Sequence, residues 1–213
     1  MTNGTKVKKR DGRIEPLDLE KMHLMVEEAT KGLAGVSASQ VEMKSGIQFY
    51  DGITTAEIQE ILIKAASDLI DLDHPNYQFV AARLLLFSLR KSLYGKMREL
   101  PHLESHIMDC CARDVYDKDI FTKYSKEEIA KANSMVDHDR DFLFTYAGLR
   151  QVVDKYLVQD RSTGGVYETP QFMYIMIALT IFRDYPKETR LSYVKRYYDA
   201  ISRHRLNIPT PIM

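Results

Sequence analysis

The chain has 213 residues, of which 45% are hydrophobic and 28% charged, an ordinary balance for one large or two modest globular domains. Its 30 basic and 30 acidic residues give a net charge of zero. A dedicated nucleic-acid binder needs a basic excess to neutralise phosphates, so this class is disfavoured. Cys110 and Cys111 are the two cysteines, and their adjacency excludes a zinc ribbon and favours a reducing compartment.

The hydropathy of the chain gives no sign of a signal peptide or a membrane-spanning helix. Residues 1–6 are too polar for a signal peptide, and the longest apolar stretch, residues 172–182, is too short to cross a bilayer. We therefore expect a cytoplasmic protein that contacts neither membrane nor nucleic acid.

The first residues predict a small β-hairpin. Residues 6–9 and 13–16 read as short strands, and Asp11-Gly12 between them favours a tight turn. Asp18 can then cap a helix that runs to about residue 33.

Three further helices are expected at residues 39–49, 54–69 and 76–93. Thr54 followed by Glu57 is a capping-box pattern, which marks the start of the middle one. The last is apolar on several sides, as is typical of the central helix of a bundle. Residues 1–95 are thus predicted to form a β-hairpin cap on a four-helix bundle.

A second, mainly α region is predicted over residues 96–213. Helices are expected near residues 102–113, 125–134, 138–156, 170–184 and 187–203, with a second β-hairpin at 156–168 that turns at Gly164-Gly165. Residues 207–213 are apolar and interrupted by prolines, so we expect the chain to be one piece of a longer polypeptide.

The chemistry concentrates around the first hairpin. Lys9 and Arg10 flank its turn, and Lys21 and Lys91 add two cations on helices. A nucleoside triphosphate carries about four negative charges and favours free N–H groups at a helix start, where Thr55 could also donate a hydroxyl. The alternative is that these cations are solvated edge charges that discourage aggregation. No Gly-rich P-loop sequence is present.

Several motifs together resemble one family. In the first region they are Lys9-Arg10-Asp11-Gly12, Leu19-Glu20-Lys21, residues 48–53 with Thr55, residues 77–84, residues 89–91 and Tyr94-Gly95; in the second they are residues 137–141, 155–159, 185–190 and 209–213. This set is similar to the large subunit of class I ribonucleotide reductases, with an ATP-cone followed by the N-terminal helical region of the catalytic domain. The resemblance covers nearly the whole chain.

The resemblance implies an allosteric activity site for ATP as activator and dATP as inhibitor, with Mg²⁺ accompanying the phosphates. The implied nucleotide-binding residues are Lys9, Arg10, Glu15, Pro16, Leu17, Asp18, Leu19, Glu20, Lys21, Thr55, Gln59 and Lys91. Lys9, Arg10, Lys21 and Lys91 are expected at phosphates, and Glu15 and Asp18 near the adenosine. Gln59 departs from the histidine of better-known relatives. Because glutamine cannot become cationic, we expect weaker phosphate binding or weaker inhibition by dATP.

The resemblance also implies a part in reducing ribonucleoside diphosphates to deoxyribonucleoside diphosphates for DNA synthesis. Thr210 falls on a position that helps hold the substrate phosphate. The catalytic cysteines of the family have no match here, since neither Cys110 nor Cys111 falls on their positions. Our hypothesis is that the chain is one piece of a divided large subunit. Activity is therefore expected to need the rest of the large subunit and the radical-generating small subunit, in an oligomer.

For several other residues a structural role competes with a catalytic one. His138, between acidic neighbours, is expected to be a structural hydrogen-bonding residue rather than a metal ligand, and Tyr193, Tyr197 and Tyr198 to be core or interface residues rather than a radical relay. A stand-alone nucleotide-sensing module is the main alternative function. A transcriptional regulator would need a DNA-reading element, which the sequence lacks.

Overall fold

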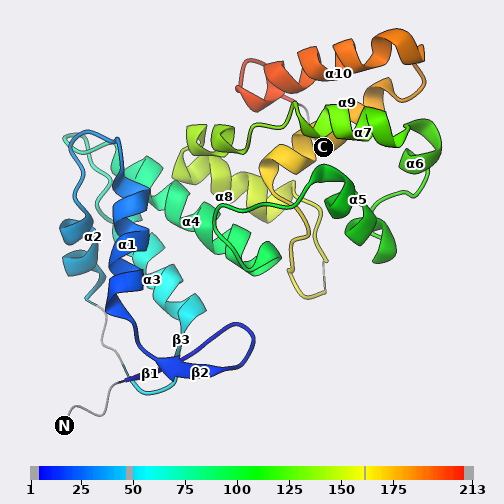
Figure 1. Ribbon diagram of the computed structural model, residues 1–213. Helices are drawn as coiled ribbons and strands as arrows, with labels where there is room; N and C mark the ends of the chain where they lie inside the picture. The colour runs from blue at the N-terminus through cyan, green and yellow to red at the C-terminus, as the bar shows by residue number, and fades with distance from the viewer. Residues whose placement is uncertain (1–4, 47–49, 161, 209–213) are drawn as a thin grey trace. The chain divides into compact units, whose positions relative to one another are not determined.

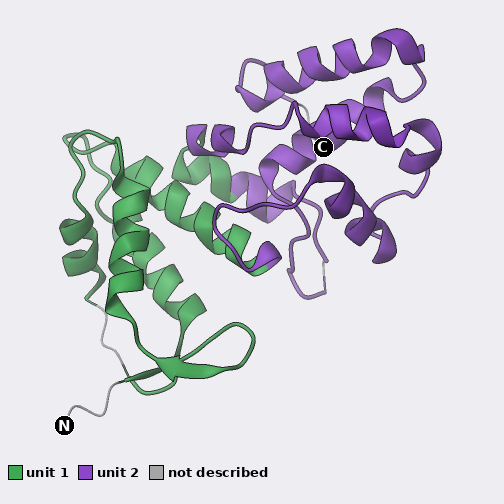
Figure 2. Ribbon diagram, in the orientation of Figure 1, with its two compact units in different colours: residues 1–92, 144–150 green, residues 93–143, 151–213 purple. Residues whose placement is uncertain are grey.

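The computed structural model describes residues 5–46, 50–160 and 162–208 (Figure 1). The chain divides into two compact units, Met1–Ser92 with Phe144–Arg150 and Leu93–Leu143 with Gln151–Met213 (Figure 2). The mainly helical fold class predicted from the sequence is confirmed, whereas the domain boundary at residues 95–96 stays a prediction.

A three-stranded sheet lies at one end of the helices of the first unit (Figure 1). Strands β1 (Lys6–Lys8) and β2 (Ile14–Pro16) form the predicted antiparallel hairpin. Gly12 has a φ of 87°, a conformation that glycine adopts without strain, and closes the turn through its N–H bond to the Lys9 carbonyl at 3.0 Å. The sequence analysis missed strand β3 (Ile53–Thr54), which pairs in parallel with β1.

Four helices follow the predicted order in this unit: α1 (Leu19–Thr30), α2 (Ala38–Ser45), α3 (Thr55–Ser67) and α4 (Tyr77–Tyr94). The Asp18 carboxylate caps α1 by accepting from the Lys21 N–H at 3.1 Å, and Thr54 with Glu57 forms the predicted capping box of α3. Helix α4 is buried on several sides, which makes it the centre of the unit.

The apolar core of this unit joins the sheet to the helices. Its buried side chains come from strands β1 and β3 and from all four helices: Val7, Ile53, Val26, Ala29, Val41, Ile58, Leu62, Ile63, Val80, Leu84 and Phe87. Because Val7 and Ile53 are paired in the sheet and buried together, the hairpin is fixed to the helices by hydrophobic burial. This fixes the position of the loop that carries Lys9 and Arg10.

The second unit is a helical assembly. Its elements are α5 (Leu103–Ala112), α6 (Ile120–Lys123), α7 (Lys126–Asn133), the 3₁₀ helix η1 (His138–Leu143), α8 (Tyr146–Lys155, whose first turn belongs to the first unit), α9 (Pro170–Phe182) and α10 (Lys187–Ser202). Helix α9 begins with a proline, whose fixed φ suits the first helical turn, and packs along α10 (Figure 1). None of the helices within the described residues is long and apolar enough to span a bilayer.

Two expectations for the second unit need correction. The single helix predicted at residues 138–156 is broken into η1 and α8, because Thr145 caps α8 through its hydroxyl, which accepts from the Gly148 N–H at 3.3 Å. The predicted hairpin at residues 156–168 is a loop closed by one β-bridge, Gln159 with Val166. The short helix α6 was not predicted.

Candidate functional site

Seven of the predicted nucleotide-binding residues, from the hairpin and the start of α1, line one hollow of about 610 Å³. Its walls are Lys9, Glu15, Pro16, Leu17, Asp18, Leu19 and Lys21. The hollow exists because β2 ends at Pro16 and Asp18 caps α1 three residues before Lys21, so the chain bends sharply between strand and helix.

Charges of both signs face each other in this hollow. The Lys9 ammonium lies 3.3 Å from the Glu15 carboxylate, and the Lys21 ammonium lies 3.2 Å from that of Asp18. Hydrogen bonds from Lys21 lower the pKa of Asp18, so this carboxylate is ionised at neutral pH and can accept from a hydroxyl or an amine. Exposed pairs of this kind are weak, so a ligand can exchange partners with them at little cost.

Next to Lys9 along the chain, Arg10 reaches into the helices. Its guanidinium donates to the Gln59 side-chain oxygen on α3 at 2.6 Å and to the Ser88 hydroxyl on α4 at 2.9 Å. Both partners are buried, with 4% and 9% of their surface exposed. Burial lowers the pKa of Arg10, although an arginine stays charged at any physiological pH.

Lys91 completes a cationic cluster. It lies one helical turn beyond Ser88 on α4, and its ammonium is 3.9 Å from the Met25 sulfur of α1. Burial lowers the pKa of Lys91, and repulsion from Arg10 and Lys9 lowers it further. Among the described residues neither Arg10 nor Lys91 forms an ion pair, so this cluster holds more positive than negative charge.

The remaining predicted residues that the structure describes do not line the hollow. Thr55 is the first residue of α3, and Glu20 is exposed in the first turn of α1; neither lines the hollow. Thr210 lies outside the described residues. Sequence reasoning missed Ser88 and Met25, although the spacing of Ser88 three residues before Lys91 on a helix was a usable signal.

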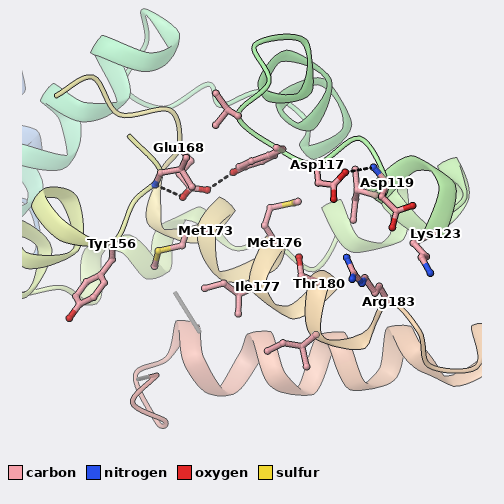
Figure 3. A pocket seen from close by; sticks show the side chains of 15 residues that line it. Asp117, Asp119, Lys123, Tyr156, Glu168, Met173, Met176, Ile177, Thr180 and Arg183 are labelled. Atoms are coloured by element: carbon pink, nitrogen blue, oxygen red, sulfur yellow. Dashed lines mark hydrogen bonds between the residues drawn. The ribbon is translucent and has the colours of Figure 1, made fainter. Parts of the chain in front are cut away.

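A second cavity, of about 360 Å³, lies in the second unit (Figure 3). Apolar side chains of α9, among them Met173, Met176 and Ile177, form one wall, and Lys123 and Arg183 lie toward one end. Both cations already contact Asp184, at 2.7 and 3.5 Å. No unpaired cationic cluster therefore faces this cavity in the part of the chain that the structure describes.

A buried hydrogen-bonded chain closes the other end of this cavity. The Glu168 carboxylate accepts from the Tyr116 hydroxyl and, at 2.8 Å, from the Val158 N–H, and His106 lies 3.2 Å from the same hydroxyl (Figure 3 shows the two bonds to Glu168). Burial raises the pKa of Glu168 to about 7 and lowers that of His106 to about 4. His106 stacks on Phe172, so the chain is enclosed by apolar packing.

The histidine and tyrosines for which a structural role competes with a catalytic one are buried or pack against other aromatic rings of this unit. Tyr198 is fully buried, donates to the Gln171 side chain at 2.7 Å and accepts from the Asp137 N–H at 2.9 Å. The His138 ring contacts that of Phe172, and Tyr193 and Tyr197 pack on Phe182. Within the described residues, no group of three or more His, Cys, Asp or Glu is placed to hold a metal ion.

Comparisons with known proteins divide the chain in two. Residues 5–92 match the ATP cone domain, and residues 142–213 match the all-alpha domain of ribonucleotide reductase. The cationic cluster of Lys9, Arg10 and Lys91 lies wholly within the ATP cone match.

Relatives are similar over the full length of the chain. It is 49% identical over 213 residues to the alpha subunit of ribonucleoside-diphosphate reductase 1 from Escherichia coli, and 47% identical to the alpha subunit from Haemophilus influenzae. The alpha subunit of Enterobacteria phage T4 is 44% identical over 181 residues, which is 84% of this chain and 24% of that subunit. The chain spans about 28% of the length of the two bacterial relatives. It belongs to the family of class I ribonucleotide reductase large subunits and corresponds to their N-terminal region, which carries the ATP cone.

Proposed function

We propose that the first unit binds ATP and dATP as allosteric effectors at the hollow and cationic cluster around Lys9. The observation that carries this proposal is the excess positive charge of Lys9, Arg10 and Lys91, of which only Lys9 has a carboxylate partner among the described residues. Partly buried cations that repel one another are costly without a counter-ion. A polyphosphate supplies that counter-ion.

The geometry suggests a role for each part of the site. Lys9, Arg10 and Lys91 would hold phosphates, and Lys21 would join them once its exposed pair with Asp18 opens. Glu15 and Asp18 would accept from the ribose or the adenine amine, while Pro16, Leu17 and Leu19 offer apolar contact to the base. Glu20 and Thr55 do not line the hollow, and Gln59 would act through its hydrogen bond to Arg10.

Mg²⁺ would arrive with the nucleotide. The described residues offer no ready-made group of ligands for a metal, but phosphate oxygens hold Mg²⁺ with few protein contacts. Glu15 and Asp18 are the acidic groups that line the hollow.

For the whole enzyme, we propose that this chain contributes regulation and structure to the reduction of ribonucleoside diphosphates. Residues 1–95 would be the regulatory domain and residues 96–213 an incomplete N-terminal part of the catalytic domain. In this proposal the catalytic cysteines come from the rest of the large subunit, and the radical comes from the small subunit. The active enzyme is an oligomer, and Thr210 helps to hold the phosphate of the substrate. The names of the relatives, all of them alpha subunits of ribonucleoside-diphosphate reductases, support it.

Calorimetric titration of the purified 213-residue chain tests the effector proposal. ATP and dATP should bind saturably in the presence of Mg²⁺, and GTP should bind much more weakly because Glu15 and Asp18 are acceptors suited to the adenine amine. Circular dichroism of the same sample shows whether the chain is folded. A folded chain that binds neither ATP nor dATP would refute the proposal.

A further inference from the structure

Arg10 is anchored in an unusual way for a cation between helices. Its two hydrogen-bond acceptors, the Gln59 side-chain oxygen on α3 and the Ser88 hydroxyl on α4, are both neutral. A partly buried arginine more commonly meets a carboxylate, which neutralises its charge. Here Glu60 acts on Arg10 through its charge without a direct contact, and its carboxylate lies 3.8 Å from Arg150.

The orientation of Gln59 is set from its other end. Its amide oxygen faces the Arg10 guanidinium, and its amide nitrogen lies 3.4 Å from the Met25 sulfur, which the Lys91 ammonium also approaches at 3.9 Å. The amide can satisfy both neighbours only in this orientation, because the oxygen accepts and the NH₂ group donates. Gln59 therefore contacts Arg10 directly and is linked to Lys91 through the Met25 sulfur.

Ser88 supplies the second point of attachment from the central helix. It lies one turn before Lys91 on α4, so both side chains project on the same side of that helix. Two hydrogen bonds from one guanidinium nitrogen to two different helices leave Arg10 little rotational freedom. A side chain as long as arginine otherwise loses rotamer entropy when a ligand orders it, and the two anchors reduce this loss.

We infer that Gln59 and Ser88 are positioning residues, which hold Arg10 as an oriented but uncompensated cation for the phosphates of the effector. This inference rests on the proposed function, because it concerns the same site. The neutrality of the two anchors is the essential property. They fix the direction of the guanidinium without consuming its charge, whereas a carboxylate would fix it and cancel it.

The sharpest test changes the charge of an anchor and leaves its shape. In Gln59→Glu the new carboxylate would pair with Arg10 and repel the phosphates, so ATP affinity should fall by roughly 100-fold or more. In Gln59→Ala and Ser88→Ala the charge of Arg10 stays but its orientation is lost, and the fall should be about 5- to 20-fold. Ser88→Thr keeps the hydroxyl and should bind ATP nearly as well as the original chain.

A double-mutant cycle separates positioning from a general structural role. In an Arg10→Ala background, Ser88→Ala should weaken ATP binding no further, because there is no guanidinium left to position. Ser92→Ala is the matched control, since the Ser92 hydroxyl on the same helix donates only to the Leu89 carbonyl at 2.7 Å. It should leave the ATP affinity unchanged.

Calorimetry with Mg²⁺-ATP on the full chain gives each affinity, and circular dichroism confirms that each variant is folded. The inference is overturned if Gln59→Glu binds ATP as tightly as Gln59→Ala. It is also overturned if Ser88→Ala matches Ser92→Ala, or if its loss persists without Arg10. Absence of ATP binding by the unmodified folded chain would refute the proposed function itself, which is a separate result.

Discussion

The two units treat a partly buried arginine in opposite ways. In the second unit the Arg190 guanidinium makes bonds of 2.6 and 2.7 Å to the Glu128 carboxylate, so the two charges compensate each other in a closed network. In the first unit the network around Arg10 ends on neutral groups and leaves positive charge without a counter-ion. A closed network stabilises a fold, whereas an open one with excess charge is a candidate site for an anionic ligand.

The largest effect is expected from opening a closed network. Arg190→Ala should lower the free energy of unfolding by about 3–5 kcal/mol, because it leaves the largely buried Glu128 carboxylate unpaired. Urea denaturation followed by circular dichroism measures this loss. Arg113→Ala, which breaks an exposed pair with Asp109, should cost at most about 1 kcal/mol. Similar losses in the two variants would mean that the buried pair is not a special support of the second unit.

A second effect concerns pH and the Glu168 network. Because the folded-state pKa of Glu168 is about 7, above its ordinary value of 4.5, the folded state binds the proton more tightly, and this residue lowers stability progressively as pH rises from 4.5 to 7. His106, with a folded-state pKa of about 4, acts oppositely, since its contribution to stability rises with pH between 4 and 6.5.

Glu168→Gln should remove the first contribution and leave the second. The variant should gain stability over the original chain between pH 5 and 8, by roughly 2–3 kcal/mol at pH 8. Urea denaturation at several pH values gives the difference, and Glu99→Gln, an exposed carboxylate, is the control. A difference between the two proteins that does not change with pH would contradict the raised pKa of Glu168.

The third effect tests the open network through its ligand. Lys9→Ala and Lys91→Ala should each weaken ATP binding by roughly 1–3 kcal/mol, the scale of a lost charge-assisted hydrogen bond. Lys64→Ala, which removes an exposed lysine of α3 paired with Asp68, should have no such effect in the same titration. Unchanged affinity in both of the first two variants would exclude the proposed phosphate site.

The smallest effect is a change in pH dependence. Lys91 has a lowered pKa and bound phosphate would raise it, so ATP affinity should be flat near neutral pH and fall in the alkaline range. Gln59→His would add a group that titrates near pH 6.5, so affinity should rise several-fold as the pH falls below that value. Calorimetry at pH 6, 7 and 8 compares the ATP affinity of the original chain with that of Gln59→His. The same dependence of affinity on pH in both would show that position 59 is remote from the phosphates.

The sequence predicted the elements that depend on local signals. The turn at Gly12, the cap at Asp18 and the capping box at Thr54 are set by neighbouring residues, and the structure confirms each of them. Strand β3 escaped prediction because two residues carry no recognisable period, and only its pairing with the distant strand β1 defines it.

The candidate site divides in the same way. The residues that line the hollow all lie between Lys9 and Lys21, so the hollow could be predicted from a short stretch of sequence. In contrast, Arg10 contacts Gln59, 49 residues further along the chain, and Ser88, 78 residues further along. No local sequence pattern predicts a contact of this kind. The Glu168 network has the same character, since it depends on a bond to Tyr116, 52 residues away.

Hydrogen–deuterium exchange of the folded chain with and without Mg²⁺-ATP tests the contrast between the two units most directly. ATP should slow exchange in the hairpin and first turn of α1, residues 6–21, and at the Ser88–Lys91 turn of α4, while residues 103–202 stay unchanged. Protection confined to the second unit, or no protection anywhere at saturating ATP, would contradict the assignment of the open cationic network as the ligand site.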